Sequence, residues 1–328
     1  MDLASVFAET TVSLRFHPHA SVLLVMGAVA VFYWWAFTRL GPKEVQTGEV
    51  VSTPRQRNWI VFGFVATFVF SYWPLHDIAE KYLFLAHMTQ HTVFTLVAPA
   101  CFLLGSPAWL WRWALRNRAL RSFTRFGAKP VVALMVFNTL IAVTHYPAVV
   151  ERSLHNEVFH FSVHFVLFAS ATLMWIPVIN RHPDLPRLRT PVKMMYLFAQ
   201  SIVPTVPASF LTFSSTPLYK TYLEAPRMIR GLDAVGDQQI AAAIMKLGAG
   251  FLLWSVVAGL FVRWWQDSRD GLEDDRSLSE SGTSVTLRPA GRPQIAGMTI
   301  TGKRVVPEVL TWESVQAEFE AIDAAQQP

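Results

Sequence analysis

Two pairs of histidines are the residues of this sequence best suited to chemistry. The first pair is His87 and His91 in HMTQH, and the second is His160 and His164 in HFSVH. Residues four apart on a helix lie about 40° apart around its axis, so each pair presents two imidazoles on one face. Neutral imidazole is a ligand for copper, zinc and iron. The spacing therefore predicts a metal site where the two helices meet, and a purely structural polar cluster is the alternative.

Four further residues could join these histidines or have structural roles. Met88 points about 100° away from its neighbour His87, which favours packing. Asp237 opens the last apolar segment, where an acid also suits the start of a helix. His145 ends another such segment. Lys246 could balance an acid or extend to the membrane surface. The sequence leaves both explanations open for these residues, and Thr89, Gln90 and Ser162 are candidates to fix imidazole tautomers by hydrogen bonding.

The segments that carry the histidines belong to a chain with the composition of a membrane protein. Of its 328 residues, 52% are hydrophobic and only 16% are charged, with a mean hydropathy of +0.32. The apolar residues gather into blocks of about 20, the length that crosses a bilayer as a helix. We therefore predict an all-α, polytopic membrane helix bundle of about seven spans. The expected spans are 20–39, 58–74, 82–104, 130–149, 158–180, 192–213 and 240–264.

The distribution of lysine and arginine predicts the orientation of these spans. The loops 40–57, 105–129 and 181–191 hold twelve cations, whereas the segments on the other side hold six. The amino terminus is then outside and the carboxyl terminus cytoplasmic. This orientation places both histidine pairs in the outer halves of their spans. Ionisable groups at such a depth face the bundle interior or a wet cavity.

Three domains follow from this pattern: an outer amino-terminal segment 1–19, a membrane domain 20–265, and a cytoplasmic, largely disordered tail 266–328. The tail is rich in Ser, Thr, Gly and Pro and cannot bury enough apolar area to fold. Pro204 and Pro207 are expected to kink the sixth span. Cys101 is the only cysteine, which excludes an internal disulfide and a Cys-x-x-Cys carrier. The net charge of +5 is explained by the excess of lysine and arginine in the loops predicted to be cytoplasmic, so no nucleic-acid partner is expected.

Three motifs in order resemble a known family. The third span, HMTQHTVFTLVAPACFLLGSP, resembles the His-x-x-Gln-His signature of the multi-pass CtaG family of cytochrome c oxidase assembly factors. The fifth span, with HFSVH and a final WIP, resembles that family's His-x-x-x-His span. The run DQQIAAAIM resembles its Asp-Gln-Gln signature, although Lys246 follows where a Trp is usual. The resemblance covers about residues 20–265.

The resemblance implies a role in maturing haem-copper oxidase in the bacterial cell (inner) membrane, with copper delivery as the usual proposal. It implies a chaperone and not an enzyme, with copper bound at His87, His91, His160 and His164. Partners would be oxidase subunits or other copper-handling proteins, together with the lipid bilayer. Two other classes remain open from the residues alone. One is a transporter of copper or another metal, although the inner halves of the spans carry few ligating residues. The other is a redox protein with a single bis-histidine haem.

Overall fold

The computed structural model describes residues 15–16, 18–180, 182 and 184–280, and all the regular elements among them are helices. The chain divides into two compact units, Met1–Leu272 and Glu273–Pro328. Most of the predicted tail 266–328 and of the predicted segment 1–19 therefore lies outside the described residues. The last helix continues to Glu280, fifteen residues beyond the expected end of the membrane domain.

The predicted all-helical membrane bundle is confirmed. Five helical stretches are long and apolar enough to cross a membrane: Ala20–Glu44, Phe84–Gly105, Glu157–Ile179, Thr190–Phe213 and Ala234–Arg269. Two bent pairs bring the number to seven if each pair is one span. They are Pro54–Ser71 with Leu75–Lys81, bent by 47°, and Arg118–Gly127 with Pro130–Thr144, bent by 80°. The chain is thus a multi-pass membrane protein.

The helices follow the chain in a simple order. They are α1 (Ala20–Trp35), α2 (Gly41–Glu44), α3 (Pro54–Ser71), α4 (Leu75–Lys81), α5 (Phe84–Thr92), α6 (Ala98–Gly105), α7 (Ala108–Ala114), α8 (Arg118–Gly127), α9 (Pro130–Thr144), α10 (Pro147–His155), α11 (Glu157–Ile179), α12 (Thr190–Ile202), α13 (Thr205–Phe213), α14 (Lys220–Glu224), α15 (Ala234–Ala243) and α16 (Ala249–Glu280). Three π-helical turns interrupt long helices: η2 (Ala36–Leu40), η3 (Val93–Val97) and η4 (Ile244–Gly248).

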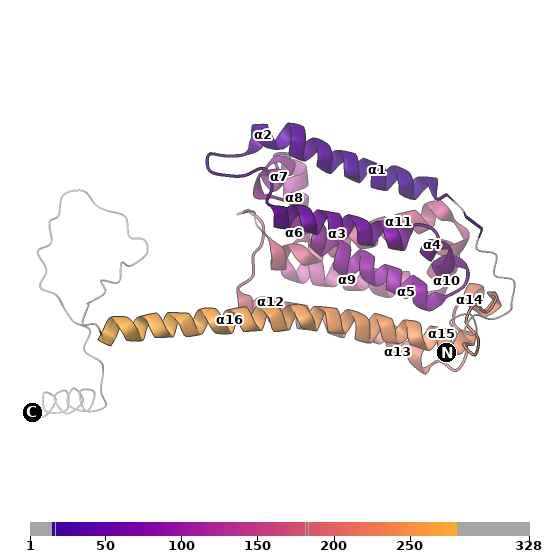
Figure 1. The fold of residues 1–328 in the computed structure, drawn as a ribbon. Helices are drawn as coiled ribbons and strands as arrows, with labels where there is room; N and C mark the ends of the chain where they lie inside the picture. The colour runs from indigo at the N-terminus through magenta and orange to yellow at the C-terminus, as the bar shows by residue number, and fades with distance from the viewer. Residues whose placement is uncertain (1–14, 17, 181, 183, 281–328) are drawn as a thin grey trace, which may run out of the picture. The chain divides into compact units, whose positions relative to one another are not determined.

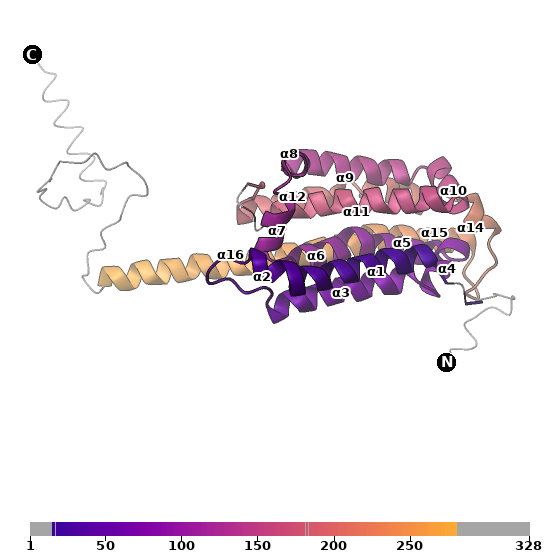
Figure 2. The ribbon, with the colours of Figure 1, turned by 90° about the horizontal axis from the view of Figure 1, so that it is seen from above.

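The long helices of the first unit run side by side, and the short helices gather at its two ends (Figure 1). One end holds α4, α10 and α14, together with the starts of α5, α11 and α15; we call it the histidine end. The opposite end holds α2, α7 and α8 and is called the basic end. Seen from above, α11 lies between α9 and α6 (Figure 2). This arrangement brings the two histidine-bearing helices, α5 and α11, into one bundle.

Local sequence explains where several helices begin. Thr53 accepts a hydrogen bond from the Gln56 amide while the Gln56 side chain accepts one from the Thr53 amide, which forms a capping box before α3. Asn156 caps α11 by accepting from the Phe159 amide at 2.9 Å. The helix break between Ile202 and Thr205 falls at Pro204, as the sequence predicted.

The fourth predicted span, 130–149, is too long at its carboxyl end. Helix α9 ends at Thr144, and α10 starts anew at Pro147. Proline disfavours helical backbone in the residue before it, and here Tyr146 is extended with ψ of 132°. His145 therefore lies in a turn between two helices.

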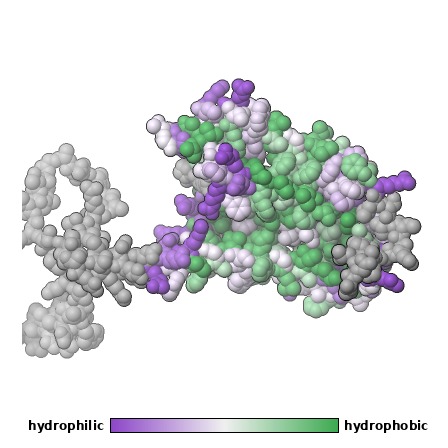
Figure 3. All heavy atoms as spheres, in the orientation of Figure 1, coloured by the Kyte–Doolittle hydropathy of each residue, from purple (hydrophilic) through white to green (hydrophobic). Residues whose placement is uncertain are grey.

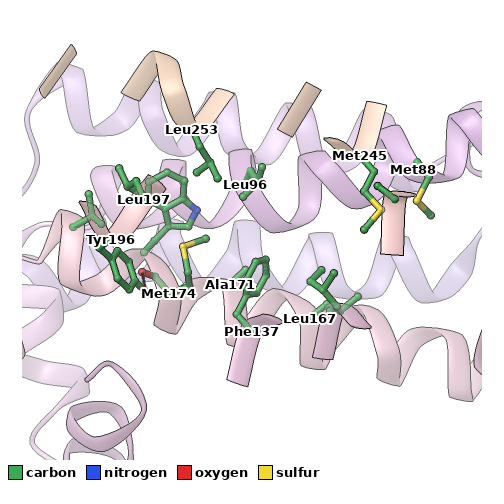
Figure 4. Close-up of a cluster of buried hydrophobic side chains, with 14 of the residues drawn as sticks. Met88, Leu96, Phe137, Leu167, Ala171, Met174, Tyr196, Leu197, Met245 and Leu253 are labelled. Carbon is green, nitrogen blue, oxygen red and sulfur yellow. Dashed lines mark hydrogen bonds between the residues drawn. The ribbon is translucent and has the colours of Figure 1, made fainter. Parts of the chain in front are cut away.

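Apolar side chains fill the inside of the bundle and also cover its outside. Leu96, Phe137, Ala171, Met174 and Leu197 are among the buried residues that pack together between the helices (Figure 4). Hydrophobic residues also spread over the visible outer face of the long helices, with polar residues mainly toward the ends (Figure 3). A soluble protein rarely exposes so large an apolar surface. In a bilayer this surface contacts lipid.

Ion pairs fasten the connecting segments at the basic end. The Arg112 guanidinium donates to the Glu49 carboxylate, and this hydrogen bond lowers the pKa of Glu49 to about 2. Arg116 pairs with Glu44 in the same way. The Trp109 indole donates to the Val51 carbonyl at 2.7 Å. Helix α7 is thereby attached to the segment between α2 and α3.

Two glycines allow α3 and α6 to approach closely. A Cβ atom on Gly105 would lie 2.4 Å from Ile60 Cγ1 and 2.9 Å from the Gln56 carbonyl oxygen. A Cβ atom on Gly63 would lie 2.9 Å from Cys101 Cβ. Small residues commonly permit such contacts between membrane helices.

We expect Gly105→Ala to lower the free energy of unfolding by about 1–3 kcal/mol because the added methyl group meets backbone that cannot move aside. The measurement is SDS-induced unfolding of the full chain in micelles. Gly259→Ala is the matched control, since a Cβ there meets nothing within 4 Å. Equal stability of the two variants would contradict the close α3–α6 contact.

Candidate metal centre

Three of the four predicted ligands meet between α5 and α11. One ring nitrogen of each of His87, His91 and His164 lies within 4.8 Å of the others. His91 Nε2 is 3.1 Å from His164 Nε2, so these two nitrogens converge across the helix interface. The ring centroids of His87 and His91 are 4.5 Å apart, as expected for two imidazoles on one helix face.

The surroundings of this histidine cluster suit a bound ion. His87 is buried, and its Nδ1 atom has no hydrogen-bond partner among the described residues. A buried polar nitrogen without a partner is destabilising by about 1–3 kcal/mol. A metal ion coordinated by neutral imidazoles would satisfy such a nitrogen. The three residues therefore fit a first-row transition metal by ligand type and spacing.

His160, the fourth predicted ligand, lies beside this cluster and faces a different group. Its ring centroid is 4.3 Å from that of His164. Its Nε2 atom lies 3.1 Å from Glu80 Oε1, close enough for an ion pair although the two are not aligned for a hydrogen bond. Its Nδ1 atom lies 3.2 Å from the Ser153 hydroxyl.

The residues that the sequence suggested as tautomer-fixing partners have other contacts. The hydroxyl of Thr89 donates to the Leu85 carbonyl, and that of Ser162 to the Val158 carbonyl, each within its own helix. Gln90 does contact an imidazole, but that of His76, at 3.0 Å. Sequence reasoning missed His76 and Glu80, whose four-residue spacing on α4 repeats that of the two histidine pairs.

Comparison with known families settles what kind of protein this is. The family model described as cytochrome c oxidase caa3 assembly factor, Caa3_CtaG, matches residues 18–267, which include every helix that contributes to the cluster. The chain belongs to this family. Comparison with curated proteins and with solved structures finds no match. The resemblance read from the three motifs is confirmed, and the role of oxidase assembly factor comes with it.

In this CtaG family member the Asp-Gln-Gln run fixes backbone on neighbouring segments. Asp237 accepts hydrogen bonds from the amides of Phe84 at 2.8 Å and Leu85 at 3.0 Å, so it caps α5 and not its own helix. Asp233 caps α15 instead. The side chain of Gln238 accepts from the Leu218 amide and donates to the Leu211 carbonyl.

The cap on α5 explains why that helix begins where it does. Leu83, in the capping position, offers no side-chain hydrogen bond to the first amides. An uncapped amino terminus inside the bundle would leave donors unpaired. The carboxylate of Asp237 satisfies two of them and also suits the positive end of the helix dipole. His87 and His91 follow one and two turns later, so their position depends on this contact.

A cavity of about 50 Å³ adjoins the cluster on the side away from the histidine end. Its lining includes Met88, His91, His145, Met245 and Lys246. Met88 and Met245 come from α5 and η4, and their side chains lie near one another (Figure 4). His145 contributes its ring 6.2 Å from that of His91, while its Nδ1 atom lies 2.6 Å from the Ile141 carbonyl oxygen. Three of the four residues that the sequence left open thus line this cavity together with His91, and the fourth, Asp237, caps the helix that carries His87 and His91.

We expect Asp237→Ala to lower the free energy of unfolding by about 1–3 kcal/mol, because one buried and one partly buried amide lose their acceptor. Asp233→Ala is the comparison variant, since its cap is exposed and water can replace it. SDS unfolding in micelles measures both. A smaller effect at Asp237 than at Asp233 would show that the α5 cap does not hold the bundle.

Proposed function

We propose that this assembly factor binds copper at His87, His91 and His164 and aids its delivery to cytochrome c oxidase. The observation that carries the proposal is the convergence of three imidazoles with a buried His87 nitrogen that has no partner. Copper is the cargo in this role, so the chain acts as a chaperone and not as an enzyme. The family to which the chain belongs supports the link to the oxidase.

The ligand types near the cluster suit copper in particular. Imidazole nitrogen binds Cu(II), and thioether sulfur favours Cu(I). Met88 and Met245 line the cavity that also contains His91, so both kinds of ligand lie in one region. A site that must accept copper and later release it gains from having both. His160, the fourth ligand predicted from the sequence, lies outside this group of three and within one helical turn of His164.

The charge distribution supports loading from outside the cell membrane. Arg112, Arg116, Arg118, Arg121 and Arg125 lie on or beside α7 and α8 at the basic end, where the positive-inside rule places the cytoplasm. The histidine end then faces outward, with the amino terminus outside and the carboxyl terminus in the cytoplasm of a bacterial cell. The partners in this proposal are oxidase subunits or other copper-handling proteins, reached from the outer side of the inner membrane.

Copper analysis of the purified full chain tests the proposal. We expect about one copper ion per chain, and loss of at least 90% of it in His87→Ala with His91→Ala, because two of the three ligands are gone. His155→Ala is the matched control, since this exposed histidine lies at the same end of the bundle. Elemental analysis and absorption spectra are the measurements. A Soret band would indicate haem, and unchanged copper in the double variant would place the metal elsewhere.

Copper affinity should fall as the pH is lowered, because protons compete with the metal for imidazole nitrogen. Equilibrium dialysis against a copper buffer measures this on the full chain in micelles, from pH 8 down to the lowest pH at which circular dichroism shows the helices intact. His155→Ala should show the same profile as the unmodified chain. An affinity independent of pH would argue against histidine ligation.

A further inference from the structure

A second group of metal-binding side chains lies between the histidine cluster and the surface of the histidine end. His76 Nε2 is 3.2 Å from Glu80 Oε1, and His160 Nε2 is 3.1 Å from the same oxygen. His76 and Glu80 belong to α4, and His160 belongs to α11. Two imidazole nitrogens, one from each element, therefore contact the same carboxylate oxygen. The Nε2 atom of His160 is buried there without a hydrogen-bond partner.

Both histidines of this group are held by their other ring nitrogen. His76 Nδ1 lies 3.0 Å from the Gln90 side-chain nitrogen, and His160 Nδ1 lies 3.2 Å from the Ser153 hydroxyl. Gln90 is itself fixed, since it donates to the Phe70 carbonyl at 2.8 Å. At His160 the Ser153 hydroxyl can accept from Nδ1–H, which is how metal-ligating histidines are typically oriented. At His76 the Gln90 amide donates to Nδ1 instead and fixes the position of the ring. The arrangement leaves both Nε2 atoms directed at the carboxylate.

Two imidazoles and one carboxylate form a recognised ligand set for zinc, iron and Cu(II). The set is harder than the three imidazoles of the buried cluster, because it includes an oxygen ligand. When Glu80 is ionised, the set also carries a negative charge, which attracts a cation from water. The Glu80 side chain is 25% exposed, whereas that of His160 is only 8% exposed. The group therefore reaches from solvent into the bundle.

Further charged groups flank the site on α4 and before α1. Asp77 pairs with Lys81 and with His19, whose Nε2 atom lies 3.2 Å from Asp77 Oδ2. The His19 ring centroid is 4.5 Å from that of His76. On the inner side, the His160 ring is 4.3 Å from His164, which is 4.7 Å from His91. Imidazoles thus follow one another in short steps from the histidine end to the buried cluster.

We propose that His76, Glu80 and His160 form a receiving site that captures Cu(II) from the outer solution and passes it to His164, His91 and His87. This rests on the proposed function of the buried cluster. Transfer proceeds by ligand exchange: each imidazole nitrogen ahead binds the ion as one ligand behind releases it. The oxidation state of the ion does not change in this step. His160 and His164, one turn apart on α11, are the ligands between which the ion moves.

The experiment follows the rate at which the full metal-free chain in micelles takes up Cu(II) from a fluorescent chelator in a stopped-flow instrument. We expect Glu80→Gln and His76→Ala each to slow the uptake at least tenfold, while the final copper content stays at the unmodified level. Glu157→Gln is the matched control, because it removes one negative charge from an exposed residue at the same end. It should load at the unmodified rate.

A second comparison separates the receiving site from the buried cluster. We expect His87→Ala to retain fast, weak Cu(II) binding, and Glu80→Gln added to His87→Ala to abolish it. Unmodified uptake rates in both Glu80→Gln and His76→Ala would overturn the receiving site and leave the proposed function intact. Tight copper binding that survives His87→Ala with His91→Ala would overturn the proposed function instead. Circular dichroism of each variant verifies that its helices are formed.

Discussion

The hydrogen bonds from the Phe84 and Leu85 amides to the Asp237 carboxylate determine the position of the site. They join the start of α15 to the start of α5, two segments separated by about 150 residues of chain. A charged acceptor at a helix amino terminus in a region with little water gives a strong, directional contact. Because α5 carries His87 and His91, the register of this contact sets the depth at which their imidazoles lie.

Other buried polar contacts extend the same framework around the cluster. Tyr222 donates to the Ala79 carbonyl at 2.7 Å and so connects α14 to α4, which carries His76 and Glu80. Tyr219 donates to the carbonyl of His145 at 2.9 Å. The short helices at the histidine end are therefore held by side chains of the segment before α15. Polar groups that would be costly in lipid are instead paired, and they orient the helices that bear ligands.

The fold could be predicted from the sequence because membrane spans depend on local properties. Length, apolar content and proline positions located seven segments, and their ends differ from the helices by a few residues at most positions. The histidine pairs were found for the same reason, since a spacing of four residues places two side chains on one helix face. Apolar content alone did not account for Pro147, so the fourth span was predicted to continue to residue 149 although helix α9 ends at Thr144.

What the sequence could not give was the division of the four histidines between two neighbouring groups. That division depends on the bend between α3 and α4, which brings His76 and Glu80 against α11. The destination of the Asp237 carboxylate was equally hidden, because an acid at a helix start ordinarily caps its own helix. Here Asp233 has that role and leaves Asp237 available for α5. The contact of α4 with α11 and the contact of Asp237 with α5 both join residues far apart in the chain, so the spacing of residues in the sequence does not predict them.

The π-helical turn η3 divides one span into two parts: α5, which carries His87 and His91, and α6, which packs against α3. Pro99 cannot donate to the Thr95 carbonyl, and the helix widens just before it. A π turn contains one residue more than an α turn, so the helix beyond it is rotated by about 100° relative to an uninterrupted helix. The face that carries His87 and His91 and the face of α6 that packs against α3 are therefore related by a different rotation from the one that an uninterrupted α-helix would give. The π turn lets a single span direct its imidazoles toward α11 while its other half packs against α3.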